Sequence, residues 1–441
     1  MSRNRFGKLR VCSNEALQKK RFVELSLKQK MKRFLIPIIL MTVFATANAQ
    51  NAKAVSADKP EKIVTFVKTE YSTDWYAKQA KLWEAEIKKD PNNDDAWLNW
   101  FRATRYHIMH AAWDAANDSK GHPVEDYSPL KKIAERLAKE RPNSYARYMI
   151  DYYCQNFVNG FECEDNMMKA IKMRPDPDNE EIYADYVVYL LRKGETDLMA
   201  DILKKWYNTG QYSYNILSYS YNVLAGMEPN GILFVNGDAA IFSALLVKYG
   251  KDLFKDKTII CAGLLTAPGY LDLVCKELGM ELDVDLKTAP QNNYIDDQYR
   301  RWSCKIFTAF AEKSGRPVYF STFLSEANDR KFQQNLYSEG LVYKYSNVKY
   351  DNLAVKRKNF EEVYLTDYLY QTFVPETYNA TAYKINLNYL PCFSSLLNYY
   401  RSTGNKVQED KLYKMLKHIL DSSKDLLDDQ DYKRYYDEID R

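Results

Sequence analysis

Histidine is scarce in this chain, with four in 441 residues, and the short motifs of common enzyme sites are absent. The sequence contains no GxxxxGK[ST] phosphate loop, no GxGxxG dinucleotide fingerprint and no GxSxG nucleophile elbow. It has no CxxC pair, so it carries neither a zinc-ribbon nor a thioredoxin-like pattern. We therefore expect no cofactor and find no motif-level evidence for an enzyme.

The chain also lacks an apolar run of the roughly 20 residues that a membrane-spanning helix needs. Its most apolar segment lies in residues 31–49, where Lys32 and Arg33 precede the run 34–44 and small residues end at Ala49. This pattern predicts a secretory signal peptide cleaved near Ala49, and no cysteine follows it to carry a lipid anchor. We expect a periplasmic or otherwise exported protein with no transmembrane span in the mature chain.

Signal peptides begin a chain, so residues 1–30 are interpreted as a mis-assigned start, with a long functional leader as the alternative. Residues 1–49 hold 11 Lys or Arg and two Asp or Glu, so their removal changes the formal net charge from +4 to −5. A slightly acidic product without a basic run predicts no nucleic-acid partner. The remaining length suits two or three domains.

Six cysteines follow the predicted cleavage position, and an exported protein can oxidise them. Buried thiols are the favoured interpretation, because a large domain does not need disulfides to fold. If a disulfide forms, Cys154 and Cys163 are the local candidates.

The stretch after residue 71 has helical periodicity. Tyr76, Ala80, Trp83 and Ile87 recur at spacings of four, three and four, which places them on one helix face. Pro91 ends this helix, and similar Pro-containing breaks recur at positions 142 and 175, which are 33 residues apart. Residues 71–226 resemble tetratricopeptide repeats, whose period is 34. The resemblance implies a concave helical surface able to hold a peptide or a protein.

Aromatic residues make up 14% of the chain, with 37 tyrosines. Core packing between helices is the simpler interpretation of most of these rings. The number nevertheless exceeds what a core needs, and tyrosine is enriched at protein interfaces, so we expect a surface that binds a protein partner.

Short β-prone runs alternate with helical segments in the middle of the chain. They are Ile232–Val235, Thr258–Ala262, Val318–Ser321 and Leu341–Tyr345. Alternation of this kind predicts a mainly parallel sheet covered by helices. The predicted fold is thus α-rich, with tetratricopeptide-like hairpins flanking a small α/β core. The expected organisation is a linker (50–70), a helical repeat-like domain (71–228), an α/β core (229–350) and a C-terminal helical domain (351–441).

Four ordered blocks carry a second resemblance: GILFVNGDAAIF (231–242), TIICAGLLTAPGYLD (258–272), GRPVYFSTFLSEA (315–327) and LYSEGLVYKYS (336–346). They resemble the C-terminal soluble region of a Bacteroidetes membrane-protein family of unknown function, whose amino-terminal half is similar to protein O-mannosyltransferases. The match runs from about Pro229 to Ser346, with weaker agreement to about Ile419.

Two departures from that family restrict what the resemblance implies. The membrane half has no counterpart here, so no glycosyl transfer is implied. The first block has Ala239, Ala240 and Ile241 where the family has Asn-Asp-Thr. If those polar groups bind a ligand in the family, this chain has lost most of them.

Polar residues at predicted strand ends are the candidate ligand-binding groups, because ligands bind at the carboxyl ends of parallel strands. They are Asn236, Asp238, Thr266 and Ser321. Asp238 could bind a sugar hydroxyl or a cation, but an Asp in a turn more often accepts backbone N–H bonds. Helix capping and turn formation are likewise the stronger interpretations of Thr266 and Ser321. No catalytic residue is assigned.

A second cluster lies on a predicted helix, where His107, His110 and Asp114 share one face. Adventitious metal binding by an exported helix is favoured over a functional site, and we assign no metal.

The sequence therefore favours an exported, non-catalytic cell-envelope protein that acts as a protein–protein interaction module or scaffold through helical surfaces. The alternatives are a module binding a carbohydrate or another small ligand at the strand ends, and a degenerate enzyme of envelope glycan metabolism. The last rests on analogy alone.

Overall fold

The computed structural model describes residues 59–64, 70–119, 124–159, 164–174, 180–282, 297–324, 329–370 and 379–440. They all belong to one compact unit, Ala45–Arg441. The expected signal peptide, the segment before it and most of the expected linker lie outside the described residues. So does Cys163 of the expected pair, whereas Cys154 carries a free thiol. No helix within these ranges is both long and apolar enough to cross a membrane.

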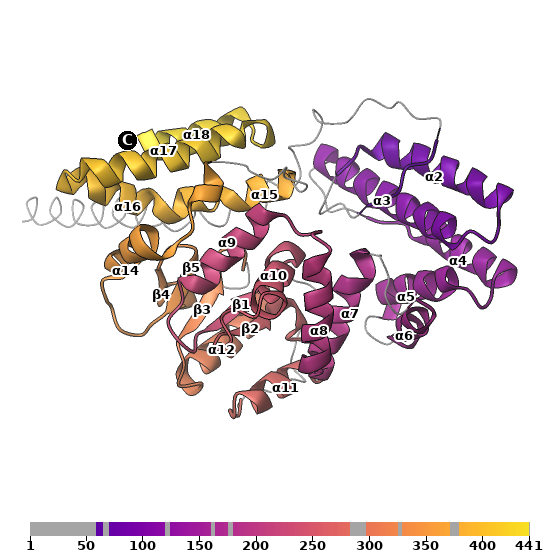
Figure 1. The fold of residues 1–441 in the computed structure, drawn as a ribbon, viewed down its shortest axis with the longest axis horizontal. Coiled ribbons are helices and arrows are strands. Elements are labelled where there is room, and N and C mark those ends of the chain that lie inside the picture. Colours follow the sequence, from indigo (N-terminus) through magenta and orange to yellow (C-terminus); the bar gives the residue numbers. More distant parts are fainter. Residues whose placement is uncertain are drawn as a thin grey trace, which may run out of the picture. The chain divides into compact units, whose positions relative to one another are not determined.

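Helices make up the N-terminal part of the described chain (Figure 1). In chain order they are α2 (Thr73–Lys89), α3 (Asp94–Ser119), α4 (Ser128–Glu140), α5 (Tyr145–Asn159), α6 (Glu164–Met173), α7 (Glu180–Lys193), α8 (Thr196–Asn208) and α9 (Tyr214–Ala225). Neighbours in sequence pack on each other: α2 on α3, α4 on α5, α5 on α6, and α7 on α8. The expected helix-rich character of this part is confirmed.

Local signals in the sequence set the limits of α2. The Ser72 hydroxyl caps the helix by accepting a hydrogen bond from the Trp75 amide at 3.2 Å. The helix ends just before Pro91, which has no N–H with which to continue it. Tyr76 and Ile87 are buried on one face, as their spacing predicts.

The aromatic stripes of these helices form their core. Trp97 and Phe101 of α3 and Tyr145 of α5 are fully buried in one hydrophobic cluster. Phe101 also stacks on Tyr153, with ring centroids 6.1 Å apart. These rings therefore pack between helices, in agreement with the simpler interpretation of the aromatic content.

A five-stranded sheet follows α9. Its strands are β1 (Ile232–Val235), β2 (Thr258–Cys261), β3 (Val318–Ser321), β4 (Leu336–Ser338) and β5 (Val342–Tyr345). Their order is β2-β1-β3-β5-β4, and β1 runs parallel to both β2 and β3. β5 is antiparallel to β3 and to β4. Its direction relative to β4 follows from the Glu339–Leu341 connection, a hairpin that is too short for a parallel crossover. The sheet is mixed, and the expected parallel arrangement holds for β2, β1 and β3.

Helices cover both faces of the sheet. The intervening elements are α10 (Asp238–Leu245), the π-helical turn η3 (Leu246–Gly250), η4 (Ala262–Leu264), α11 (Tyr270–Glu277), α12 (Asp297–Lys313) and α13 (Arg330–Gln333). On one face Phe234 and Phe320 stack on each other, and Phe307 of α12 packs 4.8 Å from the Phe234 ring. On the other side α10 contacts β2 and α9. The sheet is thus the buried middle layer, as its continuous apolar strands predict.

The C-terminal part is again helical. It comprises α14 (Asn352–Lys358), η7 (Asn359–Val363), η8 (Asp367–Leu369), α15 (Asn379–Asn386), α16 (Tyr389–Thr403), α17 (Lys406–Ser422), η9 (Lys424–Leu426) and α18 (Asp429–Asp440). Gly404 joins α16 to α17 with a φ of 68°, a left-handed conformation that favours glycine, as the expected tight turn requires.

Buried tyrosines join this C-terminal part to α9 and to the sheet. The Asn222 amide of α9 donates to the Tyr389 hydroxyl at 2.8 Å, and Tyr389 lies 3.1 Å from the Tyr368 hydroxyl. Tyr219 of α9 likewise meets the Thr322 hydroxyl at 3.1 Å. Tyrosine supplies apolar area together with a hydroxyl that must find a partner when buried. Much of the tyrosine excess therefore serves contacts within the chain, which weakens its use as evidence for an external partner.

Candidate functional site

The parallel strands end at one edge of the sheet, where the candidate ligand residues lie. Asn236 follows β1, and its side chain lies against Gly263, just after β2. A Cβ atom added to Gly263 would lie 2.9 Å from Asn236 Oδ1. The same oxygen accepts a hydrogen bond from the Gly237 amide at 2.9 Å, so Asn236 supports its own turn. Thr266 is exposed, and it makes no hydrogen bond to the other candidates in the part of the chain that the structure describes.

Asp238 is the first residue of α10, and its side chain is exposed. Among the described residues its carboxylate has no hydrogen bond that acts on its pKa, so the expected role of accepting backbone N–H bonds is not seen. The protein that surrounds the carboxyl on its other sides raises its pKa, while Arg105 of α3 acts in the opposite direction. Arg105 also offsets the raised pKa of Glu125. Asp238 thus has an exposed residue surface, while the protein around its carboxyl group disfavours the charged form and Arg105 favours it.

Ser321 differs from the other candidates because it is buried, with 6% of its surface exposed. Its Oγ has no hydrogen-bond partner in the described structure. The next residue, Thr322, is engaged by Tyr219 at 3.1 Å. The structure therefore brings Asn236, Asp238 and Ser321 to the edge where the parallel strands end, and of these three Ser321 is the buried one.

The histidine cluster on α3 is divided among different partners. His107 Nδ1 lies 3.2 Å from the Thr73 carbonyl, and Asp114 accepts a hydrogen bond from the Thr73 hydroxyl at 2.7 Å. His110 is buried against the Tyr76 ring, with Nδ1 3.6 Å from Glu70 Oε1. Within the described ranges, no group of three or more His, Cys, Asp or Glu side chains is arranged to hold a metal.

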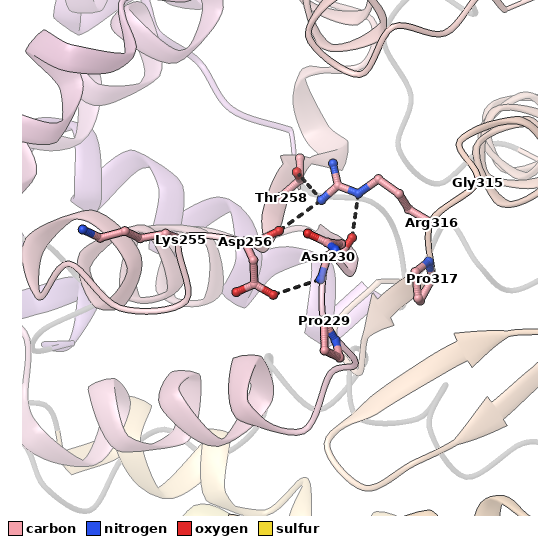
Figure 2. Close-up of a pocket in the computed structure, with 8 residues that line it drawn as sticks. All are labelled: Pro229, Asn230, Lys255, Asp256, Thr258, Gly315, Arg316 and Pro317. Atoms are coloured by element: carbon pink, nitrogen blue, oxygen red, sulfur yellow. Dashed lines mark hydrogen bonds between the residues drawn. The ribbon is translucent and has the colours of Figure 1, made fainter.

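A cavity of about 440 Å³ lies at the opposite edge of the sheet, where β1, β2 and β3 begin (Figure 2). It is lined by Pro229, Asn230, Lys255, Asp256, Thr258, Gly315, Arg316 and Pro317. These residues come from the three segments that lead into the parallel strands. Two cationic side chains and one anionic side chain reach it.

Arg316 ties the starts of the three strands together. Its Nε donates to the Asn230 carbonyl at 2.6 Å, and its Nη2 donates to the Asp256 carbonyl at 3.2 Å and to Thr258 Oγ1 at 2.9 Å. Partial burial lowers the pKa of Arg316, and the nearby Asp256 carboxylate partly restores it. Arg316 therefore lies in a fixed orientation beside the cavity.

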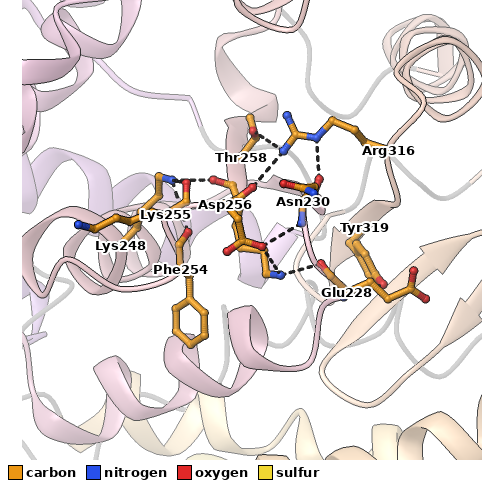
Figure 3. Close-up of polar contacts among 10 residues, drawn as sticks. Glu228, Asn230, Lys248, Phe254, Lys255, Asp256, Thr258, Arg316 and Tyr319 are labelled. Atoms are coloured by element: carbon orange, nitrogen blue, oxygen red, sulfur yellow. Dashed lines mark hydrogen bonds and ion pairs between the residues drawn. The ribbon is translucent and has the colours of Figure 1, made fainter.

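The Asp256 carboxylate is held in place as well (Figure 3). It accepts hydrogen bonds from the backbone N–H of Asn230 at 2.9 Å and from Lys257 Nζ at 3.0 Å, and these bonds lower the pKa of Asp256. Lys257 is 6% exposed and also donates to the Glu228 carbonyl at 2.6 Å. The negative charge of Asp256 is therefore already compensated.

A second buried lysine supports the loop that carries Asp256 (Figure 3). Lys248 Nζ donates to the carbonyls of Lys255 and Lys257 at 2.9 and 2.7 Å, and it lies 3.5 Å from the Phe254 carbonyl. Burial lowers the pKa of Lys248. Three carbonyl dipoles thus fix both this cation and the path of the loop.

Another unusual lysine lies in the C-terminal part. Lys356 of α14 is 4% exposed, and its Nζ donates to the Ser395 hydroxyl at 3.0 Å. Burial lowers the pKa of Lys356 to about 8. The neighbouring Cys392 is a free, buried thiol whose pKa is raised by the same burial to about 12.

The residues around the cavity were not among the sequence-derived candidates, although a signal for them exists. Asn230, Asp256 and Arg316 each stand two residues before the start of a predicted strand. Because parallel strands begin at one edge of a sheet, polar residues in these positions are brought together. The buried role of Lys356 has no such signal, since its side chain follows an ordinary polar helical pattern.

No family model, no curated protein and no solved structure matches this chain.

Proposed function

We propose that this chain is an exported, non-catalytic cell-envelope protein that binds protein partners through tetratricopeptide-like helices in its N-terminal part. The observation that carries the proposal is a set of half-buried aromatic rings at the border of the helical core. Trp100, Tyr148 and Tyr189 pack on that core while keeping part of their surface open. Rings held in this way can bury area against a partner at little cost in side-chain entropy.

Cationic side chains lie over these rings. Arg136 lies 5.5 Å from the Trp100 centroid, Lys169 lies 5.6 Å from Tyr148, and Lys193 lies 5.4 Å from Tyr189. The contacts hold the rings in place. Arg136 and Lys193 also pair with Glu140 at 2.7 Å and with Glu164 at 3.1 Å, so their positive charge is largely compensated. A partner segment rich in apolar residues fits this surface.

Two resemblances in the sequence support the same proposal. The 33-residue interval between Pro142 and Pro175 is close to the tetratricopeptide period. The blocks between Pro229 and Ser346 resemble the soluble region of a Bacteroidetes envelope family. The signal-peptide pattern of residues 31–49 supplies the proposed export.

Affinity purification from envelope extracts of the source cells tests the proposal. We expect the mature chain to retain a specific protein, and the double variant Tyr148→Ser, Tyr189→Ser to lose it. Tyr436→Ser on α18 is the control, because it removes a partly exposed tyrosine far along the chain from these helices. Equal retention by all three proteins, with unchanged circular dichroism, would show that the N-terminal rings do not bind the partner.

A second candidate function is binding of a carbohydrate or another small ligand at the carboxyl ends of the strands. It is favoured by the exposed residue Asp238, whose carboxylate is influenced by Arg105 and by no hydrogen bond from the described residues. Thermal stabilisation by envelope glycans, lost in Asp238→Asn but kept in Asp272→Asn, would favour this function. Stabilisation that is the same in both variants would exclude Asp238 from the site.

A further inference from the structure

The turn of the β4–β5 hairpin contains a carboxyl group that is fully removed from solvent. Glu339 is 0% exposed, and its Oε1 accepts a hydrogen bond from the Tyr350 hydroxyl at 2.6 Å. Its Oε2 has no hydrogen-bond partner among the described residues. A buried carboxylate is costly unless donors or a cation compensate it. Glu339 is therefore poorly compensated when it is ionised.

The charged side chains around Glu339 do not neutralise it. Lys344 of β5 favours the ionised carboxylate, but its ammonium group already pairs with Glu228, whose own carboxylate acts in the opposite direction. Two cations of α14, which contacts β4 (Figure 1), bind elsewhere. Lys356 and Arg357 donate to side-chain hydroxyls of α16 at 3.0 and 3.2 Å. Lys344 is thus shared between two carboxylates.

Three tyrosines also face this carboxyl group. The hydroxyls of Tyr350 and Tyr319 favour its charged form, and Tyr319 also accepts a hydrogen bond from the Glu228 backbone N–H at 3.1 Å. Burial raises the pKa of Tyr319, Tyr350 and Tyr364, so all three stay neutral near pH 7. For Glu339 itself the cost of burial exceeds these favourable contacts, and its pKa is raised. Glu339 thus changes its protonation state at a higher pH than an exposed carboxyl group does.

Tyr350 belongs to a largely exposed strap, residues 347–351, which runs from the end of the hairpin to α14. Val348 within it is 73% exposed. Tyr350 anchors the strap on the hairpin, with its ring 4.9 Å from the Tyr337 ring and 5.5 Å from Lys344 Nζ. The residue that anchors the strap is thus the residue that bonds the Glu339 carboxyl group.

We propose that Glu339 and Tyr350 form a proton-controlled latch, which holds the strap on the β4–β5 hairpin when Glu339 is protonated and opens more often when it is ionised. A protonated carboxyl group needs fewer donors, and its O–H can donate to the Tyr319 hydroxyl. An ionised one gains water as a donor to Oε2 when Tyr350 moves away, so ionisation favours the open strap. The movement is confined to the strap, because Asn352 and Asn359 hold the start of α14 and η7 to carbonyls of the hairpin turn at 2.8 and 2.7 Å.

The direction of the pH dependence follows from the raised pKa of Glu339. When the strap is open, the solvated carboxyl group has its ordinary pKa of 4.5. Between this value and the higher pKa of the closed form, the closed form binds more protons than the open form. Each unit of rising pH in this window therefore increases the open fraction by up to about tenfold. Below and above the window both forms carry the same charge, and the open fraction is constant.

Hydrogen exchange of the purified protein, read by mass spectrometry on peptides that contain the strap, tests the latch. Glu339→Gln keeps an acceptor for Tyr350 and cannot ionise. We expect the exchange rate of the strap in the wild type, divided by the rate in Glu339→Gln at the same pH, to rise severalfold between pH 5 and pH 8. The division removes the intrinsic pH dependence of exchange. Glu362→Gln, which changes an exposed carboxylate on η7, is the matched control and should exchange like the wild type.

Tyr350→Phe provides an independent variant, because it keeps the ring and removes one donor to the carboxylate. It should increase strap exchange more at pH 8, where Glu339 is more ionised, than at pH 5. A ratio between the wild type and Glu339→Gln that stays constant with pH would overturn the proposal. So would a ratio that changes equally in peptides of α2, because that result would report unfolding of the whole chain. Equal effects of Tyr350→Phe at the two pH values would likewise contradict the latch.

Discussion

Lys356→Met is expected to stabilise the protein at neutral pH. The ammonium group of Lys356 is buried with the Ser395 hydroxyl as its hydrogen-bond partner, and burial lowers its pKa from 10.5 to about 8. At pH 7 the group is charged in both the folded and the unfolded chain. Each pKa unit corresponds to 1.36 kcal/mol, so keeping the charge in the folded protein costs about 3 kcal/mol. Methionine has a similar shape and carries no such cost.

The loss of the Ser395 contact reduces this gain. Ser395 is exposed, so water replaces the lysine and the loss is about 1 kcal/mol. The expected net gain at pH 7 is therefore about 2 kcal/mol in the free energy of unfolding. Lys358→Met, an exposed position on the same helix, is the control and should change stability by less than about 0.5 kcal/mol.

The pH dependence gives a second, independent readout. Between pH 8 and 10.5 the unfolded chain binds a proton at Lys356 that the folded chain does not, so wild-type stability rises with pH in this window. Two-state linkage predicts a rise of about 2 kcal/mol from pH 7 to pH 9.5 relative to Lys356→Met. Urea unfolding at both pH values measures it. The reasoning fails if Lys356→Met is no more stable than Lys358→Met at pH 7, or if the two variants show the same pH dependence.

Three further variants test other parts of the fold. His110 is buried, and this burial lowers its pKa, so on acidification the unfolded chain binds a proton at His110 before the folded chain does. The free energy of unfolding should therefore fall as the pH drops below 6.5. His110→Gln should reduce this fall, whereas the control His418→Gln, at an exposed site, should leave it unchanged. Gly340→Ala should lower the free energy of unfolding by more than about 2 kcal/mol, because φ is 117° and the new Cβ would lie 2.6 Å from the Tyr364 hydroxyl. Gly315→Ala places its Cβ near no other atom and should lower it by about 1 kcal/mol. Asn222→Ala deletes an amide that makes three hydrogen bonds to the C-terminal part and should lower stability by about 3 kcal/mol in urea unfolding; a loss below about 1 kcal/mol would show that water replaces those bonds.

The strands and the first helices could be predicted because their signals are local. β1 and β3 have the predicted bounds, and α2 begins and ends where Ser72 and Pro91 stand. The antiparallel direction of β5 was missed, since periodicity is the same in both directions and only the short hairpin connection sets the pairing.

The candidate ligand site could be predicted only in part. The edge to which Asn236 and Asp238 belong follows from strand direction. The burial of Ser321 depends on what packs against the end of β3, and the sequence near Ser321 does not contain that information.

The sequence by itself determined that this chain is helix-rich, that a short-stranded sheet lies in its middle, and which face of each early helix is apolar. These properties follow from spacings of two to four residues, which local backbone geometry converts directly into faces. The tertiary structure alone decided that buried tyrosines such as Tyr219, Tyr368 and Tyr389 bond to groups within the chain and that Lys356 is buried. It also decided that Asn230, Asp256 and Arg316 share one cavity. Asn230 and Asp256 are 26 residues apart, and Asp256 and Arg316 are 60 residues apart. They meet because the parallel pairing of β1 with β2 and β3 aligns the starting ends of these strands. A contact over such separations leaves no local pattern in the sequence.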